Sequence, residues 1–315
     1  MCIAYRRVGG ALVFKIELID TVSVNGDAAI TVITPIVLGI IMFGMGLGLT
    51  VPDFTRVFQY PKAAVIGLFG QLLVLPILGL FVATVLNLEP ELAVGLMILT
   101  FCPGGVMSNV MSHLARADTA LSVSLTTISS FVTPWATPIL VNLTLAHFMG
   151  NAEQVQLPLG MTSVKMIMIT VVPISLGMFV RRRWTDWALR MDRWVGILGV
   201  FFLVVVMAGI TWKERHNLAD LMLTAGGSTL VLCMVSYGYG LLSAKLGNLS
   251  TRQMSSVCIE VGMQNSTLAM VITLSFLENS RMAIPPMVYS IMMFAVGWVL
   301  VAWFHRLNKN ALNQA

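Results

Sequence analysis

Charged residues are scarce in this chain: they make up 10% of its 315 residues, whereas soluble domains carry roughly 25%. Apolar residues make up 57% and the mean hydropathy is +0.87. This balance excludes an ordinary soluble domain, and the net charge of +5 is then a property of loops and not a sign of nucleic-acid binding. Apolar runs of about 20 residues predict membrane-spanning helices, because short alternating barrel strands do not occur in the pattern.

Residues for metal binding, disulfide bonding or nucleophilic catalysis are also few. The four cysteines have no framework spacing, so no disulfide is expected. No His-Glu-x-x-His motif occurs, and an intramembrane hydrolase would need a nucleophile with a base, or metal ligands. The four histidines all lie at segment ends or in loops: His113, His147, His216 and His305. We therefore expect a protein that is not an enzyme.

Nine apolar segments are long enough to span a membrane. They run over about 29–51, 63–86, 91–114, 118–146, 160–180, 194–212, 220–244, 254–277 and 284–304. Residues 1–28 contain an apolar run that is too short to span, without a clear cleavage site, and we expect an interfacial or extracytoplasmic lead there. The sequence thus predicts a polytopic protein of a cell inner membrane or plasma membrane, surrounded by the lipid bilayer.

The basic residues of the links predict the orientation of these segments. One side holds twelve of them: Arg56, Lys62, Arg116, Arg181, Arg182, Arg183, Arg190, Arg193, Lys245, Arg252, Arg306 and Lys309. The other side holds six: Arg6, Arg7, Lys15, Lys213, Arg215 and Arg281. Because the more basic side faces the cytoplasm, we expect the C-terminus in the cytoplasm and the N-terminus outside.

Two polar, broken stretches occupy corresponding places in the two halves of the chain. Segments one to four and six to nine form quartets around the fifth, and the third member of each quartet contains one such stretch: Pro103-Gly-Gly-Val-Met-Ser-Asn109 and Glu260-Val-Gly-Met-Gln-Asn265. The quartets enter the membrane from opposite sides, which is typical of the inverted repeats of secondary transporters. We expect a lead at 1–28, a first repeat at 29–148, a linking helix and basic connector at 149–193, a second repeat at 194–304 and a cytoplasmic tail at 305–315.

Glu260 lies in the middle of an apolar segment, whereas the other acidic residues lie in loops or near segment ends. A carboxylate in the bilayer centre costs about 3 kcal/mol, and a bound cation would offset that cost. Sodium is held by oxygen atoms of the kind that cluster near both breaks: Ser108, Asn109, Gln264, the Ser122 and Thr126 pair four residues apart, and Gln71 in segment two. Alternatively, each polar side chain only bonds to a neighbouring helix.

The chain resembles the bile acid:sodium symporter family in four stretches over about 30–304. These are Gly70-Gln-Leu-Leu-Val-Leu-Pro76, Phe101-Cys-Pro-Gly-Gly-Val-Met-Ser-Asn-Val110, Ala120-Leu-Ser-Val-Ser-Leu-Thr-Thr127 and Ile259-Glu-Val-Gly-Met-Gln-Asn-Ser266. The resemblance implies an all-α fold of nine transmembrane helices, two of them discontinuous and crossed. It also implies a panel domain of segments one, five and six, and a core domain of the other six.

The resemblance further implies two sodium ions that share Glu260. One site would use Ser108, Asn109, Ser122, Thr126 and Glu260. The other would use Gln71, Glu260, Gln264 and the backbone carbonyls of Val261 and Met263.

An organic anion is the expected substrate, with Asn265 facing it and free N–H groups after Gly105 attracting its charge. Relatives that bind bile acids carry a His-Asn pair in the last helix, and that pair falls on Met293 and Phe294 here. Bile-acid-like molecules and small carboxylates such as pantoate, ketopantoate or pyruvate therefore both stay open. The expected function is sodium-coupled symport. The alternative is a proton-coupled organic-anion transporter or antiporter with Glu260 as the proton carrier.

Overall fold

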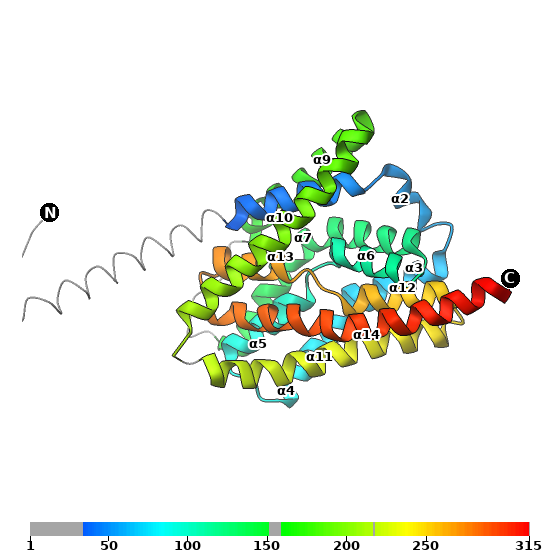
Figure 1. The fold of residues 1–315 in the computed structure, drawn as a ribbon. Coiled ribbons are helices and arrows are strands. Elements are labelled where there is room, and N and C mark those ends of the chain that lie inside the picture. The colour runs from blue at the N-terminus through cyan, green and yellow to red at the C-terminus, as the bar shows by residue number, and fades with distance from the viewer. Residues whose placement is uncertain (1–33, 151–158, 217, 315) are drawn as a thin grey trace, which may run out of the picture.

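The computed structural model describes residues 34–150, 159–216 and 218–314, and all regular secondary structure in these ranges is helical (Figure 1). The first helix is Thr34–Gly48. The others are α2 (Val51–Arg56), α3 (Pro61–Phe69), the π-helix η1 (Gly70–Val74), α4 (Leu75–Val85), α5 (Pro90–Thr100), α6 (Val106–Leu114), α7 (Thr119–Met149), α8 (Leu159–Ile169), α9 (Val171–Arg183), α10 (Thr185–Lys213), α11 (Leu218–Leu246), α12 (Thr251–Gly262), α13 (Ser266–Val271), the π-helix η3 (Ile272–Phe276), the 3₁₀-helix η4 (Arg281–Ala283) and α14 (Ile284–Gln314). The expected lead at 1–28 lies outside the described residues.

Seven helical stretches within these described ranges are long and apolar enough to cross a membrane, judged by length and composition. They are Pro61–Val85, Thr119–Met149, Gly160–Arg183, Thr185–Lys213, Met222–Leu246, Thr251–Phe276 and Arg281–Lys309. The other two predicted segments correspond to shorter apolar helices, Thr34–Gly48 and Pro90–Thr100. The expectation of a multi-pass helical membrane protein is confirmed, while a count of nine crossing helices stays a prediction.

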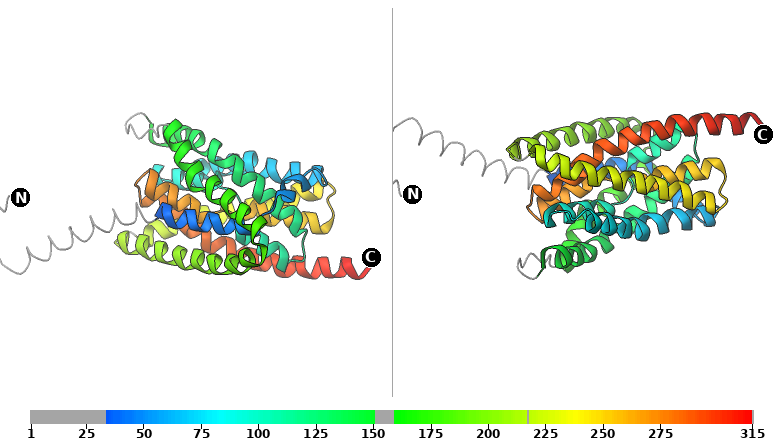
Figure 2. Two further views of the ribbon diagram at one scale, coloured as in Figure 1. Left: turned by 90° about the horizontal axis from the view of Figure 1, so that it is seen from above. Right: turned by 90° about the horizontal axis from the view of Figure 1, so that it is seen from below.

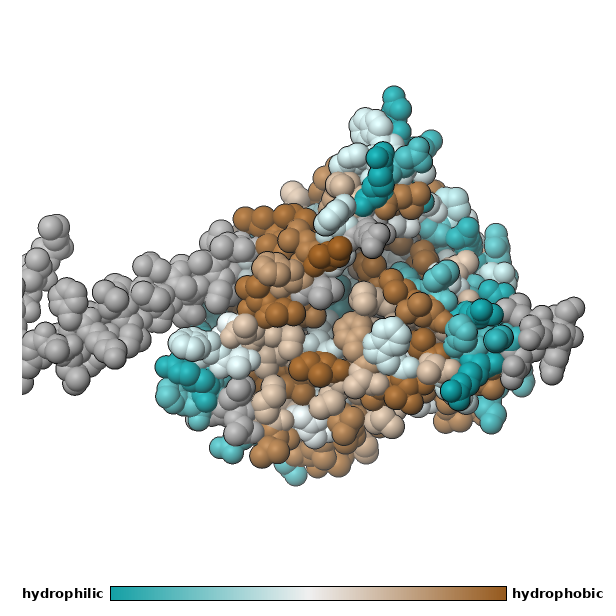
Figure 3. All heavy atoms as spheres, in the orientation of Figure 1, coloured by the Kyte–Doolittle hydropathy of each residue, from teal (hydrophilic) through white to brown (hydrophobic). Residues whose placement is uncertain are grey.

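The second broken stretch lies at the centre of the bundle. In Thr251–Phe276, 89% of the most apolar window is buried, against 12% in Thr185–Lys213. Helix α11 packs against both α12 and α14 (Figure 2). On the visible face, apolar side chains cover the middle of the molecule and polar ones gather towards the two ends of the helices (Figure 3). An apolar middle between two polar ends is the surface that helices crossing a bilayer need.

Helical structure extends through two regions that the sequence placed outside the spans. The predicted basic connector 181–193 is divided between α9 and α10, which meet at Trp184. The predicted tail at 305–315 continues α14 as far as Gln314. The predicted fifth segment is interrupted at Thr170, because Pro173 has no N–H to donate to the carbonyl of Ile169.

Candidate functional site

The two helix breaks lie against each other at the centre of the bundle. Helix α5 ends at Thr100 and α6 begins at Val106, while α12 ends at Gly262 and α13 begins at Ser266. The backbone N–H of Asn265 donates to the carbonyl oxygen of Pro103 at 2.9 Å. The irregular links therefore satisfy part of each other's backbone hydrogen bonding, which unwound peptide in a membrane interior requires.

Gly104 allows the carboxylate of Glu260 to approach the first break. A Cβ atom at position 104 would collide with Glu260 Oε1 and lie 3.4 Å from Ser108 Oγ. A glycine is thus needed there for close approach of the two chains, and the Pro103-Gly104-Gly105 sequence supplies it.

Glu260 is 1% exposed and accepts hydrogen bonds from three hydroxyl groups of two other helices. Its Oε2 accepts from Ser108 Oγ at 2.8 Å and from Ser122 Oγ at 3.0 Å. Its Oε1 accepts from Thr126 Oγ1 at 2.5 Å. Asn109 Oδ1 lies 2.9 Å from Ser122 Oγ and 3.3 Å from Thr126 Oγ1. The five residues predicted for the first sodium site are therefore gathered in one place.

This cluster has more oxygen acceptors than protons to share among them. Each hydroxyl has one proton, yet Ser108 Oγ lies within reach of Gly105 O as well as Glu260. Ser122 and Thr126 face the same choice between Asn109 and Glu260. Some oxygen lone pairs must then lack a donor, and a small cation placed among them would satisfy those lone pairs.

No basic side chain pairs with Glu260 in the part of the chain that the structure describes. None of the ion pairs found in the described ranges involves it; they join Arg56 to Asp53, and Arg281 to Glu89 and Glu91. The same ranges hold no group of three or more His, Cys, Asp or Glu side chains that could bind a metal ion. The donor set fits a monovalent, oxygen-preferring cation such as sodium better than a transition metal.

Three of the residues predicted for the second sodium site, Gln71, Gln264 and Val261, are hydrogen-bonded to one another. Gln71 Nε2 donates to Gln264 Oε1 at 2.7 Å and to Cys102 O at 3.0 Å. Gln264 Nε2 donates to Val261 O at 2.8 Å and to Gln71 Oε1 at 3.3 Å. Gln71 lies in the π-helix η1, an irregularity that is frequent at functional sites. A cation here would require the two amide groups to reorient.

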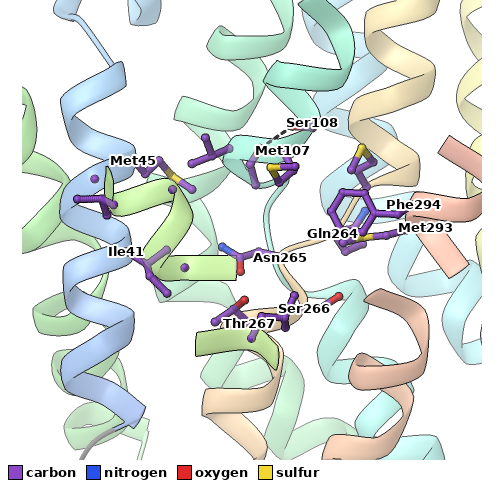
Figure 4. A pocket seen from close by; sticks show the side chains of 18 residues that line it. Ile41, Met45, Met107, Ser108, Gln264, Asn265, Ser266, Thr267, Met293 and Phe294 are labelled. Carbon is purple, nitrogen blue, oxygen red and sulfur yellow. Dashed lines mark hydrogen bonds between the residues drawn. The ribbon is translucent and has the colours of Figure 1, made fainter. Parts of the chain in front are cut away.

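A cavity of about 270 Å³ lies beside the breaks, and all four residues predicted to contact the substrate line it (Figure 4). These are Gly105, Asn265, Met293 and Phe294. Further lining comes from the first helix and α10, through Ile41, Gly44, Met45, Val195, Gly196, Gly199 and Leu203. The remaining residues come from the two breaks and the helices after them: Val106, Met107, Ser108, Met263, Gln264, Ser266 and Thr267. No Lys, Arg, His, Asp or Glu of the described ranges lines this cavity.

Asn265 supplies a hydrogen-bond donor to this apolar cavity. Its Oδ1 accepts from Leu268 N at 3.0 Å and so caps α13, which leaves the amide Nδ2 free to donate. Figure 4 shows this amide projecting between Ile41 and Met107. The cavity is thus suited to a ligand with an apolar body and an oxygen acceptor.

Sequence reasoning missed the cavity wall from the first helix and α10, because those residues are apolar or glycine and look the same as lipid-facing ones. It also missed Ser112, whose hydroxyl donates to Ser122 Oγ at 3.1 Å. Ser112 lies one helical turn after Ser108, and that spacing was a usable signal.

Comparison with known proteins agrees with this geometry. The family model described as the sodium bile acid symporter family matches residues 35–221. The chain is 32% identical over 275 residues to an uncharacterized sodium-dependent transporter, YocS, of Bacillus subtilis (strain 168), covering 87% of this chain and 83% of that protein. It is 26% identical over 284 residues to the human ileal sodium/bile acid cotransporter (89% and 80%). It is 27% identical over 273 residues to the probable chloroplastic sodium/metabolite cotransporter BASS2 of rice, Oryza sativa subsp. japonica (85% and 62%).

Proposed function

The chain belongs to the sodium bile acid symporter family, and we propose that it is a sodium-coupled symporter that carries an organic anion into the cell. The observation that carries the proposal is a cluster of six side-chain oxygen atoms: the two of the Glu260 carboxylate and one each from Ser108, Asn109, Ser122 and Thr126. The cluster has too few hydroxyl protons for its acceptors, and no ion pair to Glu260 is found in the described ranges. Transport driven by the sodium gradient uses such a site directly.

Two sodium ions are proposed, sharing Glu260. The first is held by Glu260 with Ser108, Asn109, Ser122 and Thr126, whose oxygen atoms are already gathered. The second is held by Glu260, Gln71, Gln264 and the carbonyls of Val261 and Met263, once the amide pair has opened. The order of filling follows from this difference, because the first set needs less rearrangement than the second.

The proposed substrate is an anion with an apolar body. Methionine, phenylalanine and branched aliphatic side chains line most of the cavity, and Asn265 offers its amide to an oxygen acceptor. The N-terminus of α6 adds a positive dipole end and free N–H groups. Bound sodium ions add positive charge, so the anion needs no arginine or lysine. An amphipathic carboxylate matches this lining better than a small hydrophilic keto acid does.

We assign nine membrane crossings to the chain, arranged as two inverted repeats, with the N-terminus outside and the C-terminus in the cytoplasm. The proposed panel of segments one, five and six is supported by close packing. A Cβ at Gly44 would collide with Val195 of α10, and one at Gly46 would collide with the carbonyl oxygen of Ile174 in α9. The proposed core contains both breaks.

Alternating access would come from movement of the core against the panel. Ser280 Oγ donates to Glu214 Oε1 at 2.6 Å and joins the two domains at the end of the bundle away from the C-terminus. Ile210 of α10 packs in a cluster with Met270 and Met287 near that end. These contacts support the interpretation that the transporter is closed to the outside in this conformation. They would separate when the outer side opens.

Uptake into proteoliposomes tests the proposal. Radiolabelled cholate, pantoate, ketopantoate and pyruvate are offered with an inward sodium gradient, with an inward potassium gradient, and with a pH gradient in the absence of sodium. Sodium-driven uptake of at least one anion is expected, with loss of that uptake in Glu260→Ala. Uptake driven by the pH gradient alone would contradict sodium coupling and support proton coupling.

A further inference from the structure

Two buried tyrosines connect the second helix break to a wall of the substrate cavity. Tyr237 of α11 is 3% exposed and Tyr289 of α14 is 0% exposed. Neither is among the cavity-lining residues, and the hydrogen bonds of Glu260 in the described structure do not include them. Their contacts lie on the side of α12 that faces α11 and α14.

Tyr289 holds the last peptide group of α12. The final carbonyl groups of a helix have no partner within that helix. Gln264 Nε2 donates to the carbonyl oxygen of Val261 at 2.8 Å. The hydroxyl of Tyr289 donates to the carbonyl oxygen of Gly262, also at 2.8 Å. Ser236 Oγ lies 3.1 Å from the same hydroxyl and fixes it in place. Tyr289 therefore orients the Gly262–Met263 peptide group, which lies between the carbonyl groups of Val261 and Met263.

Tyr237 touches the break with its ring and the cavity wall with its hydroxyl. A Cβ on Gly262 would collide with the Tyr237 ring, so the ring lies directly against the backbone of α12. The Tyr237 hydroxyl donates to the carbonyl oxygen of Met293 at 3.0 Å. Cys258 Sγ lies 3.3 Å from the Tyr237 carbonyl and joins the backbones of α11 and α12 at the same level.

We propose that Tyr289 and Tyr237 are positioning residues that link sodium binding at the end of α12 to the shape of the cavity at Met293. The inference rests on the proposed function, since the carbonyls of Val261 and Met263 are the ligands assigned to the second sodium ion. Cation binding there moves the peptide of Gly262. The interior is close-packed, so the Tyr237 ring takes up that movement and passes it to α14. Tyr289 sets the affinity for the ion, and Tyr237 sets the coupling.

Sodium affinity is measured first, on the purified full chain, as the rise in melting temperature when sodium replaces choline at constant ionic strength. Tyr289→Phe leaves the carbonyl of Gly262 buried without a donor, and the half-saturating sodium concentration is expected to rise about fivefold or more. Tyr237→Phe is expected to stay within about twofold of the wild type. Tyr60→Phe, at a partly exposed tyrosine before α3, is the control and should not differ.

Coupling is measured next, without any substrate, by the rate at which a maleimide labels Met293→Cys. The parent protein gives the background from its own cysteines. Sodium is expected to change the labelling rate about threefold or more, because ion binding shifts the population of cavity shapes. The change is expected to disappear in Tyr237→Phe and to persist in Tyr60→Phe. Gly297→Ala is a second test, since its Cβ would lie 2.9 Å from the Tyr237 hydroxyl; it should lose the change as well.

The outcomes separate this inference from the proposed function. A wild type that shows no sodium effect on melting temperature or on labelling overturns the proposed function. A wild type that responds to sodium, with both tyrosine variants and Gly297→Ala responding identically to it, overturns the link through Tyr237 and Tyr289 alone.

Discussion

Ser108 donates its hydroxyl proton to Glu260 Oε2 at 2.8 Å and thereby joins the start of α6 to the end of α12. The two residues are 152 positions apart and belong to different halves of the chain. Neither helix alone gathers enough oxygen atoms for a sodium ion. Ion binding should therefore depend on the crossing of the two breaks, and substitutions on either side should affect the same ion.

Thr126→Val is expected to weaken sodium binding, and Thr127→Val is its matched control. Thr126 bonds Glu260, whereas the neighbouring Thr127 donates only to Val123 O of its own helix at 2.6 Å. A hydrogen bond to a charged group is worth about 1.5–3 kcal/mol, so the half-saturating sodium concentration should rise roughly tenfold or more in Thr126→Val. Sodium titration of the melting temperature measures it. Equal effects of the two substitutions would remove Thr126 from the ion site.

Gly104→Ala should disturb the same site by a steric clash, without removing any ligand atom. Its Cβ would collide with Glu260, so the carboxylate has to move away from Ser108, at a cost of about 1–3 kcal/mol. At Gly105 the nearest atom to an added Cβ is 4.0 Å away. We expect Gly104→Ala to lose most of the sodium-dependent stabilisation and Gly105→Ala to keep it. A normal sodium response in Gly104→Ala would show that Glu260 does not bind the ion from its present position.

The polar cluster could be predicted from the sequence because a polar side chain buried in an apolar segment needs polar partners. Glu260 in an apolar segment required partners, and the hydroxyls of Ser122 and Thr126 shared one helix face with no other obvious purpose. The breaks were visible as well, since Pro103 and the following glycines do not continue a buried helix. The structure places these polar groups next to one another, and their role as sodium ligands stays a prediction.

The sequence did not predict which apolar side chains line the cavity or which polar groups hydrogen-bond to each other. Ile41 and Val195 line the cavity, yet nothing in an apolar helix distinguishes a cavity wall from a lipid-facing surface. The mutual hydrogen bonds of Gln71 and Gln264 are a consequence of tertiary packing. The sequence gives no signal for the contact between Tyr289 and Gly262, because that contact depends on how α14 crosses α12.

The wall formed by Met293 and Phe294 is expected to control the choice of anion. Both side chains line the cavity, and neither has a hydrogen-bond donor for a hydroxylated ligand. The double substitution Met293→His with Phe294→Asn adds two polar groups and should strengthen binding of cholate by roughly tenfold, about the worth of one hydrogen bond. Calorimetry in saturating sodium measures the affinity. Unchanged cholate binding would mean that the last helix does not determine selectivity.

Direct binding of radioactive sodium to the purified protein tests the central claim, that Glu260 is the shared ligand of the ion site. Glu260→Gln keeps the shape of the side chain and removes its charge, and Glu278→Gln, at an exposed carboxylate, is the matched control. The wild type and Glu278→Gln should bind sodium saturably and without competition from potassium, and Glu260→Gln should bind at least about tenfold more weakly. Equal sodium binding by Glu260→Gln and the wild type would contradict the account.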